Sequence, residues 1–367
     1  MDIRVVKNDL LRGLYLAQGI ADRRATQPIL ANVLLRTDGK QKLVCAATDL
    51  NVTISAEIPA EAKREGGVTV GAKHMFDIVK GLPGDQVHLK RTENNHCEIR
   101  AGNAEFRMVG MADRDFPKLA DPREVTYGKI DAALLRDFIA KVLFAVSSDD
   151  TRAHLAGALW ECAGDRLRMV STDGHRLCKV ERDVREAPAL DAGVIVPRKG
   201  LLELRRAIEE VDGAAEVGFH KGHLFVGTGT ATLSVKLVDA KFPPYDQVIP
   251  KDNDKVVTAQ RLALVDALRR VALVASDRTS GVKLDLGPGT LRLSTENPDL
   301  GEAHEDMAVD YAGPALAIGF NAHYLIDALQ EMGAEEVRIE LGGDLDPALI
   351  RPMAAEDYLA VVMPMRI

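Results

Sequence analysis

Two hydrophobic periods alternate along the chain. Residues 134–145 place an apolar side chain at every third or fourth position, which is typical of an amphipathic helix. Residues 52–58 alternate apolar and polar side chains, which is typical of a half-buried strand. Further helical patterns lie at residues 75–82, 201–211 and 325–332. A less regular one lies at residues 262–272, where Leu262, Val265, Arg269 and Ala272 recur at helical spacing. Their alternation with strand patterns predicts an α+β fold in which helices pack on antiparallel sheets.

The same order of elements recurs three times. Strand patterns that end in Thr-Asp, Thr-Asp and Thr-Glu lie at residues 43–49, 167–173 and 291–296, about 124 residues apart. The patterns Gly-Val-x-Val and Phe-Pro each recur once at nearly the same spacing. Markers that share one period predict three tandem copies of one unit, each with two helices and an antiparallel sheet. We place the units at residues 1–124, 125–252 and 253–367, with Pro-rich segments between them.

Charge limits the kinds of partner that the chain can bind. The 367 residues include 47 Lys and Arg against 55 Asp and Glu, which gives a formal net charge of −8. Neutralisation of phosphates supplies much of the affinity of nucleic-acid-binding proteins. An acidic chain of this kind is therefore expected to contact DNA only through a local basic surface.

Sequence patterns also argue against several classes of protein. No run of ~18 apolar residues is present for a membrane span, and residues 1–4 begin no apolar segment of a secretory signal. The four cysteines are far apart and form no Cys-x-x-Cys pair, which argues against a disulfide framework and against a cysteine zinc site. We therefore expect a cytoplasmic globular protein without a cofactor or a bound metal.

Basic residues gather on the predicted helices. They are Arg12, Arg136, Lys141, Arg269 and Arg270 on the first helices of the units, and Lys73, Lys80, Arg198, Lys199, Arg205 and Arg206 on the second helices. Three tandem units of this kind could form half of a ring, which closes if two chains join head to tail. The alternative is that the charges lie on ordinary solvated helix faces, and for any single residue that is the simpler interpretation.

Several short motifs carry a family resemblance. They are Gly-Leu-Pro at residues 81–83, Thr-Asp-Gly-His-Arg-Leu at 172–177, Val-Ile-Val-Pro-Arg-Lys-Gly at 194–200, Lys-Leu-Val-Asp at 236–239, Phe-Pro at 242–243 and Val-Val-Met-Pro-Met-Arg at 361–366. In this order and over essentially the whole chain, they resemble the bacterial DNA polymerase III beta subunit family, the sliding clamps. The resemblance implies a homodimeric ring of six domains that encircles double-stranded DNA without sequence preference. It also implies a non-catalytic role, in which the ring tethers the replicative polymerase and so raises processivity.

The resemblance further implies a hydrophobic pocket that binds peptides of the Gln-x-x-Leu-Phe type from the polymerase, the clamp loader, other polymerases and repair proteins. Its residues would be Leu155, Thr172, Gly174, His175, Arg176, Leu177, Pro243, Val248, Val361, Val362, Met363, Pro364, Met365 and Arg366. Flexible methionine side chains suit a groove that accepts several partners. A simpler interpretation is a tight turn, with Gly174 at an unusual backbone angle and Asp173 as its cap, next to a last core strand.

A DNA-facing surface and a dimer interface are also implied by the resemblance. The DNA-facing residues would be Arg24, Lys73, Lys80, Arg152, Arg198, Lys199 and Arg205. The interface would pair Phe106 of the first unit with Leu273, Val274, Glu302 and Glu305 of the third unit. The chain departs from the family pattern at Ala153 and His154, where aromatic residues can stand, and at Gln247, where a basic residue can stand.

Two other functions compete with the clamp. Asp173 and His175 could belong to a metal-dependent hydrolase or nuclease, but a metal site needs further ligands nearby and the sequence has no His-x-x-x-His or equivalent cluster. A clamp-like paralogue that binds partners without supporting replication would carry the same motifs. The clamp is the function that we expect, and the hydrolase is the alternative that the sequence supports least.

Overall fold

The structure is a computed structural model that describes residues 1–22, 24–149, 151–276 and 279–366. The described residues form two compact units. The first unit consists of residues within the ranges 1–136, 186–190 and 199–237, and the remaining described residues make the second unit. Among the described residues, no helix is both long and apolar enough to span a membrane.

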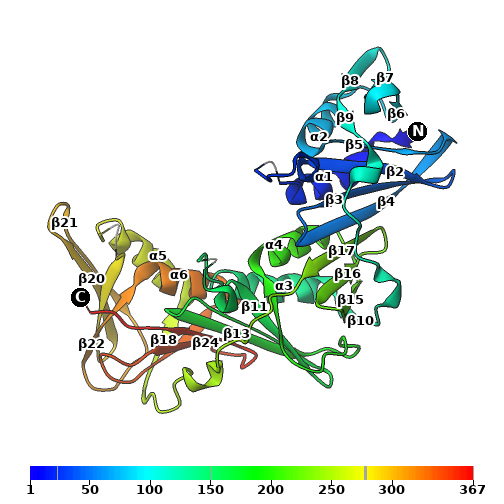
Figure 1. Cartoon of the computed structure of the whole chain (residues 1–367). Coiled ribbons are helices and arrows are strands. Elements are labelled where there is room, and N and C mark those ends of the chain that lie inside the picture. Colours follow the sequence, from blue (N-terminus) through cyan, green and yellow to red (C-terminus); the bar gives the residue numbers. More distant parts are fainter. Residues whose placement is uncertain (23, 150, 277–278, 367) are drawn as a thin grey trace. The chain divides into compact units, whose positions relative to one another are not determined.

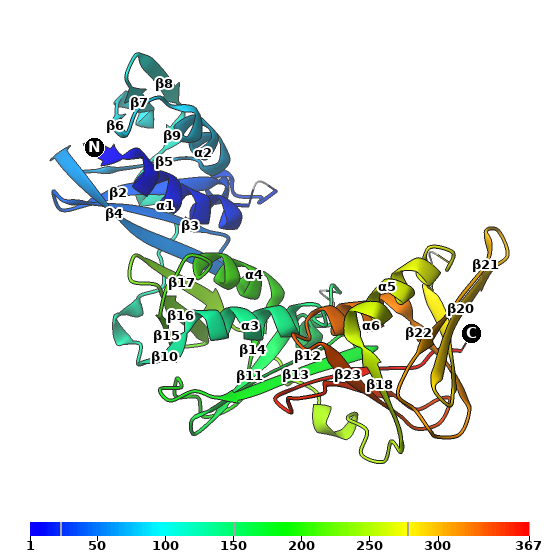
Figure 2. The ribbon, with the colours of Figure 1, turned by 180° about the vertical axis from the view of Figure 1, so that it is seen from behind.

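Each sequence repeat contributes two α-helices to the described part of the chain. They are α1 (Lys7–Ile20), α2 (Ala72–Gly81), α3 (Ala132–Leu143), α4 (Arg198–Ala207), α5 (Arg261–Ala272) and α6 (Ala322–Gln330). Helix α6 begins at a side-chain cap, because the side-chain oxygen of Asn321 accepts hydrogen bonds from the backbone N–H groups of His323 at 2.9 Å and Tyr324 at 3.3 Å. Figure 2 shows α6 lying beside α5.

The first unit is an antiparallel arrangement of strands around one long strand, β4 (Figure 1). Its strands are β1 (Asp2–Val6), β2 (Asn32–Asp38), β3 (Lys42–Thr48), β4 (Val52–Arg64), β5 (Gly67–Gly71), β6 (Gln86–Arg91), β7 (Cys97–Ala101), β8 (Ala104–Met108), β9 (Gly110–Met111), β10 (Tyr127–Asp131), β15 (Ala214–His220), β16 (His223–Gly227) and β17 (Ala231–Lys236). Strand β4 pairs with β3 and β17 along its first half and with β1 along its second half. Its buried side chains alternate with partly exposed ones, as the sequence pattern predicts.

The second unit holds two further antiparallel sheets. Their strands are β11 (Gly157–Ala163), β12 (Arg166–Thr172), β13 (Arg176–Asp183), β14 (Val194–Pro197), β18 (Lys255–Gln260), β19 (Gly281–Gly287), β20 (Thr290–Asn297), β21 (Gly301–Ala308), β22 (Leu316–Asn321), β23 (Glu336–Leu341), β24 (Ala348–Pro352) and β25 (Tyr358–Val362). One sheet has the strand order β14-β11-β12-β13-β25-β24-β23-β18, and the other has the order β21-β20-β19-β22.

Two strand pairings join different sequence repeats. In the first unit, β17 of the second repeat pairs with β4 of the first repeat. In the second unit, β13 of the second repeat pairs with β25 of the third, with Arg176 opposite Val362 and Val180 opposite Tyr358. Because antiparallel strands exchange main-chain hydrogen bonds, each join makes one continuous sheet from two repeats.

A basic side chain links the two helices of each repeat. It comes from the first helix and donates a hydrogen bond to a carbonyl at or just beyond the C-terminal end of the second helix. The donor and acceptor pairs are Lys7 with Leu82, Arg136 with Ile208 and Arg261 with Ala334, at 2.5, 2.5 and 2.6 Å. Leu82 and Ile208 directly follow their helices, where carbonyls lack partners within the helix and lie at the negative end of its dipole, so a cation there stabilises the pair. Ala334 lies beyond the end of α6, but Arg261 also donates to Leu329 O in the last turn of that helix.

The predicted alternation of helices and antiparallel strands is confirmed, but the predicted face of one helix is wrong. Leu262 was expected on the apolar face of α5, and its side chain is 62% exposed. Val265 is buried as predicted, but its neighbours on the buried face are residues 264, 267, 268 and 271, because this stripe is wholly apolar whereas the predicted one includes Arg269. The three unit boundaries stay a prediction, since the second repeat contributes strands to both compact units.

We predict that Arg261→Met loosens the end of α6. The substitution removes the donor to Ala334 O and a second hydrogen bond to Leu329 O at 3.3 Å, which should cost about 1–2 kcal/mol. Hydrogen exchange followed by mass spectrometry should show the amides of residues 329–336 exchanging about tenfold faster. Arg269→Met is the control, because Arg269 is exposed and pairs only loosely with Asp266 at 3.5 Å. Equal exchange in both variants would contradict the assignment.

Candidate functional site

The turn between β12 and β13 is held by its own side chains. Thr172 Oγ1 accepts a hydrogen bond from Gly174 N at 3.1 Å and donates one to Arg176 O at 2.7 Å. Asp173 Oδ1 accepts from the backbone N–H groups of His175 and Arg176 at 2.9 and 3.0 Å. Gly174 has a φ of 92°, which glycine adopts without strain. The predicted turn, with Gly174 at its bend and Asp173 as its cap, is therefore confirmed.

The first repeat contains the same turn in another setting. Asp49 Oδ1 accepts hydrogen bonds from Asn51 N at 2.9 Å and Val52 N at 2.6 Å, and Leu50 takes the left-handed backbone angle with φ 75°. The second carboxylate oxygen of Asp49 binds Lys199 Nζ. In the second repeat, the corresponding oxygen of the turn aspartate binds an arginine of the turn itself. The same turn thus occurs in the first and second repeats, and the partner of the second aspartate oxygen differs between the two copies.

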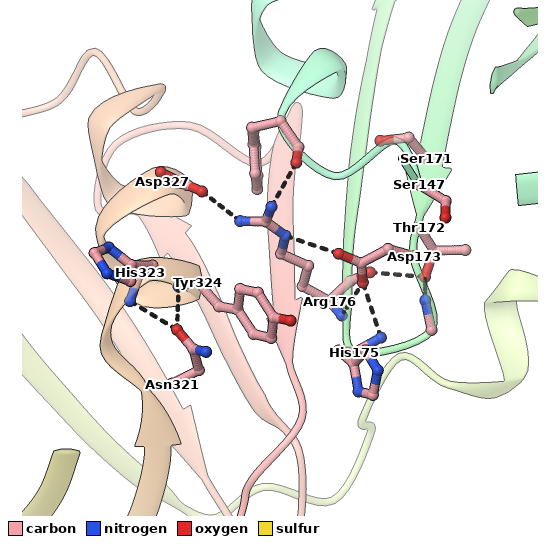
Figure 3. A network of polar contacts seen from close by, with 12 residues as sticks. Ser147, Ser171, Thr172, Asp173, His175, Arg176, Asn321, His323, Tyr324 and Asp327 are labelled. Atoms are coloured by element: carbon pink, nitrogen blue, oxygen red, sulfur yellow. Dashed lines mark hydrogen bonds and ion pairs between the residues drawn. The ribbon is translucent and has the colours of Figure 1, made fainter. Parts of the chain in front are cut away.

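Arg176 connects the turn to two helices (Figure 3). Its Nε donates to Asp173 Oδ2 at 3.1 Å, its Nη1 to Asp327 Oδ2 of α6 at 2.5 Å, and its Nη2 to Phe144 O, just past α3, at 2.7 Å. The guanidinium carbon also lies 4.6 Å from the centre of the Tyr324 ring. A planar guanidinium can satisfy several partners at once, so this side chain locks the turn in place.

Beside the turn lies an apolar cavity of about 200 Å³. It is lined by Leu155, Thr172, Gly174, Arg176, Leu177, Pro243, Pro244, Tyr245, Val248, Val361 and Met363. These residues come from the 3₁₀ turn η5 (Ala153–Leu155), the turn between β12 and β13, the 3₁₀ turn η6 (Tyr245–Gln247) with its flanks, and the end of β25. Leu177, Tyr245 and Val361 also belong to a buried hydrophobic cluster, so packed side chains support the cavity from below.

The C-terminal segment is a core strand only as far as Val362. All five residues of β25 are buried, whereas Met363 is 40% exposed. From there the backbone crosses the site, because Met363 N donates to His175 O at 2.9 Å and Met365 N to Gly319 O at 2.8 Å. Ile367, the last residue of the predicted strand, lies outside the described residues. The core-strand interpretation therefore applies to Val362, and Met363 belongs to the cavity.

The structure brings nine of the fourteen predicted pocket residues together around the cavity and adds two others. Val362 is buried in the sheet, His175 stacks on Tyr324 with ring centres 6.2 Å apart, and Pro364 to Arg366 continue along the tail. Pro244 and Tyr245 also line the cavity, and their position beside Pro243 is the sequence signal that could have found them. Tyr324 and Asp327 come from a helix about 150 residues away in the chain, and no sequence pattern pointed to them.

The predicted DNA-facing residues differ in how free their charges are. Arg24, Lys73, Lys80, Arg198 and Arg205 are exposed. Lys199 is paired with Asp49 and donates to Ile20 O at 3.3 Å. Arg152 donates to Asp149 Oδ2 at 3.1 Å and to Asp173 O at 3.0 Å, so it also supports the turn beside the cavity. Hydrogen bonds from Thr151, and then from Arg152, hold the pKa of Asp149 below its ordinary value.

The predicted interface residues lie on or near two sheet edges. Phe106 is 42% exposed on β8, and β8 ends the strand order of its sheet. Glu302 and Glu305 lie on β21, which ends the strand order of another sheet. Arg270 Nη2 and Nε donate to the two oxygens of Glu305 at 2.6 and 2.9 Å. Leu273, just past α5, is 79% exposed, and Val274 beside it is half-buried.

The cysteines and acidic groups of the described residues form no metal site. No group of three or more His, Cys, Asp and Glu side chains among them could hold a metal ion. Burial raises the pKa of Cys45, Cys97 and Cys178 to about 12, so these thiols stay protonated at neutral pH. A metal-dependent hydrolase would need a cluster of metal ligands beside His175, and the described residues contain none.

Comparison with known families decides between the predicted functions. Models of the N-terminal, central and C-terminal domains of the DNA polymerase III beta subunit match residues 1–120, 129–244 and 246–366. The chain belongs to this family. It is a sliding clamp of bacterial replication, a processivity subunit of the polymerase that performs no catalysis of its own. The family predicted from the short motifs is thereby confirmed, and the hydrolase alternative is wrong.

Individual members of the beta subunit family resemble the chain over its whole length. Beta sliding clamps of Pseudomonas aeruginosa, Pseudomonas putida and Escherichia coli K12 are 38%, 36% and 33% identical to it, with 100% of both chains covered. The crystal structure of a DnaN sliding clamp from Pseudomonas aeruginosa bound to griselimycin superposes with a TM-score of 0.94 at 36% identity. A DNA polymerase sliding clamp from Caulobacter crescentus superposes with a TM-score of 0.94 at 32% identity. Both structures cover 100% of the chain, so the three-domain clamp fold is shared.

We predict that Arg176→Met destabilises the sheet beneath the cavity. The substitution leaves Asp173 and Asp327 without their shared cation, which should cost about 3 kcal/mol. Trp160, the only tryptophan, is buried in β11 of the same sheet, so its fluorescence during urea unfolding measures the loss. Arg338→Met removes an exposed arginine from β23 of the same sheet and should change the midpoint little. A wild-type midpoint for Arg176→Met would mean that the network adds no stability.

Proposed function

We propose that the chain acts as a homodimeric ring around duplex DNA and that the cavity beside the turn at residues 172–177 binds short apolar segments of its partners. These partners are the replicative polymerase, the clamp loader, and other polymerases and repair proteins that carry clamp-binding peptides. The observation that carries the proposal is an apolar cavity built by the turn, by η6 and by the exposed end of the C-terminal strand. We further propose that the protein works in the cytoplasm, where bacterial DNA is replicated.

Peptide binding is supported by the chemistry of the cavity walls. Leu155, Leu177, Val248 and Val361 offer apolar contacts to large side chains of a peptide, and Met363 can adapt to different ones. The turn and Arg176 are held rigidly by hydrogen bonds, so little ordering is needed when a peptide binds. His175, Pro364, Met365 and Arg366 extend the proposed binding surface along the tail.

For DNA, we propose that contact is electrostatic and unspecific. The exposed cations Arg24, Lys73, Lys80, Arg198 and Arg205 can meet phosphates without reading bases. Arg152 and Lys199 belong to the same proposed set, but they contribute less charge because aspartates neutralise them. A ring needs no tight grip on DNA to stay on it, which agrees with the net charge of −8.

The homodimer is supported by the two open sheet edges. We propose that β8 of one protomer pairs with β21 of its partner, with Phe106 packed against Leu273 and Val274 and with Glu302 and Glu305 at the rim. An exposed strand edge with an exposed aromatic side chain is a hazard unless another chain covers it. We place the three domains of each chain at residues 1–124, 125–252 and 253–367. Two such interfaces between two chains would then close a ring of six domains.

We predict that the cavity binds a fluorescent peptide of the Gln-x-x-Leu-Phe type, measured by anisotropy. Deletion of residues 363–367 should weaken binding by about tenfold or more, because it removes Met363 and the tail but leaves β25 intact. His175→Ala should also weaken binding. His223→Ala, on β16 in the first unit, is the matched control and should bind as the wild type does. A folded dimer without peptide binding would favour a clamp-like paralogue instead.

We predict that the wild-type chain is a dimer, with twice the chain mass of 39.8 kDa by light scattering. Leu273→Asp should shift the mass towards the monomer, because it buries a charge in the proposed contact. Leu345→Asp, at a 56% exposed leucine of the β23–β24 hairpin, should remain dimeric. A monomeric wild type at micromolar concentration would overturn the ring.

A further inference from the structure

Tyr245 takes part both in the cavity wall and in a polar contact behind it. The residue opens the short 3₁₀ turn η6, is only 7% exposed, and packs its ring against Phe242 with centres 6.4 Å apart in an edge-on arrangement. Next to it, Gln247 and Val248 are exposed. A single 3₁₀ turn has little stability of its own, so the wall from Pro243 to Val248 depends on what anchors Tyr245.

The anchor is a row of charged residues across three neighbouring strands. Glu161 of β11 lies opposite Arg168 of β12, and Arg168 lies opposite Glu181 of β13. Arg168 Nε donates to Glu181 Oε2 at 2.8 Å, and Arg168 Nη1 donates to the hydroxyl of Tyr245 at 2.9 Å. The same hydroxyl donates to Glu161 Oε2 at 2.9 Å. Both hydrogen-bonding roles of the Tyr245 oxygen are therefore met by the row.

The charges of this row fix the direction of the two hydrogen bonds. Burial, and then the hydrogen bond to Glu161, raise the pKa of Tyr245 to about 12, so the hydroxyl keeps its proton at neutral pH. Arg168 can only donate, and an ionised Glu161 can only accept. Hydrogen bonds to charged groups are stronger than neutral ones, so the phenol is held in one orientation.

We infer that Arg168 and Glu161 are positioning residues of the peptide site, because they hold Tyr245 and with it the wall formed by Pro243, Pro244 and Val248. The inference rests on the proposed peptide-binding function of the cavity. Neither charged side chain lines the cavity itself. They act through Tyr245, because they fix its hydroxyl while its ring lines the cavity and packs on the hydrophobic cluster.

The same strand supplies a matched control. Arg166 lies two residues before Arg168, on the same face of β12, and belongs to the same charged surface. Its guanidinium lies 3.4 Å from Glu181 and 3.7 Å from Asp183. Loss of Arg166 thus removes a positive charge next to Glu181 but leaves the hydrogen bond from Arg168 to Tyr245 in place.

We predict that Tyr245→Phe and Arg168→Met each weaken binding of the Gln-x-x-Leu-Phe peptide by about three- to tenfold, mainly through faster dissociation. The double variant should bind the peptide as tightly as the single variant with the lower affinity, because both changes remove the same hydrogen bond between Arg168 and the Tyr245 hydroxyl. Arg166→Met should bind as the wild type does. Urea unfolding monitored by Trp160 fluorescence reports the stability of each variant, so a change in binding can be separated from a change in folding.

The outcomes separate the inference from the proposed function. A wild-type protein that fails to bind the peptide overturns the proposed function itself. Wild-type binding by Tyr245→Phe and Arg168→Met, or losses that multiply in the double variant, overturn the positioning role while peptide binding stands. If Arg168→Met is too unstable to test, Tyr245→Phe decides alone, since it removes only the hydroxyl and keeps the buried ring.

Discussion

Strand β13 pairs with β25 over five residues, from Arg176 opposite Val362 to Val180 opposite Tyr358. The rest of the candidate site depends on this antiparallel pairing. It places the end of the chain beside a turn about 190 residues earlier, and it lets the backbone of Met363 bind the carbonyl of His175. The equivalent pairing of β17 with β4 in the first unit shows the same solution, in which an open edge of one repeat is covered by the next.

The duplicated turn shows how one local structure acquires different roles. Both copies use a threonine hydroxyl and an aspartate oxygen to satisfy backbone N–H groups, so the turn is held by its own residues in each repeat. In the first repeat the remaining aspartate oxygen meets Lys199, on a helix of the second repeat. In the second repeat it meets Arg176, which also reaches α6 of the third repeat. The turn itself forms from neighbouring residues, whereas the contacts that it makes depend on segments far away in the chain.

This distinction explains what could be predicted from the sequence. Strand ends at Thr48 and Thr172 and the α+β class follow from local periodicity, which the structure confirms closely. The pocket residues next to family motifs were predicted, but Tyr324, Asp327 and Tyr245 were missed, because their roles arise from contacts between distant segments. For the same reason, no pattern indicated that Asp49 neutralises Lys199, which lies 150 residues away in the chain. Asp149 and Arg152, by contrast, are only three residues apart. The predicted face of α5 was wrong because Arg269 lies at the helical spacing of that face but is charged, whereas the buried residues of α5 are all apolar.

The pairing of β13 with the last strand also has a consequence for synthesis of the protein. A ribosome makes the turn at residues 172–177 long before it makes residues 358–363, so the cavity lacks the wall that Val361 and Met363 form until those residues have been made. A chain that stops before residue 358 leaves the edge of β13 that pairs with β25 uncovered, and it lacks Val361 and Met363. If the cavity binds partner peptides as we propose, such a chain would lack two residues of the binding wall.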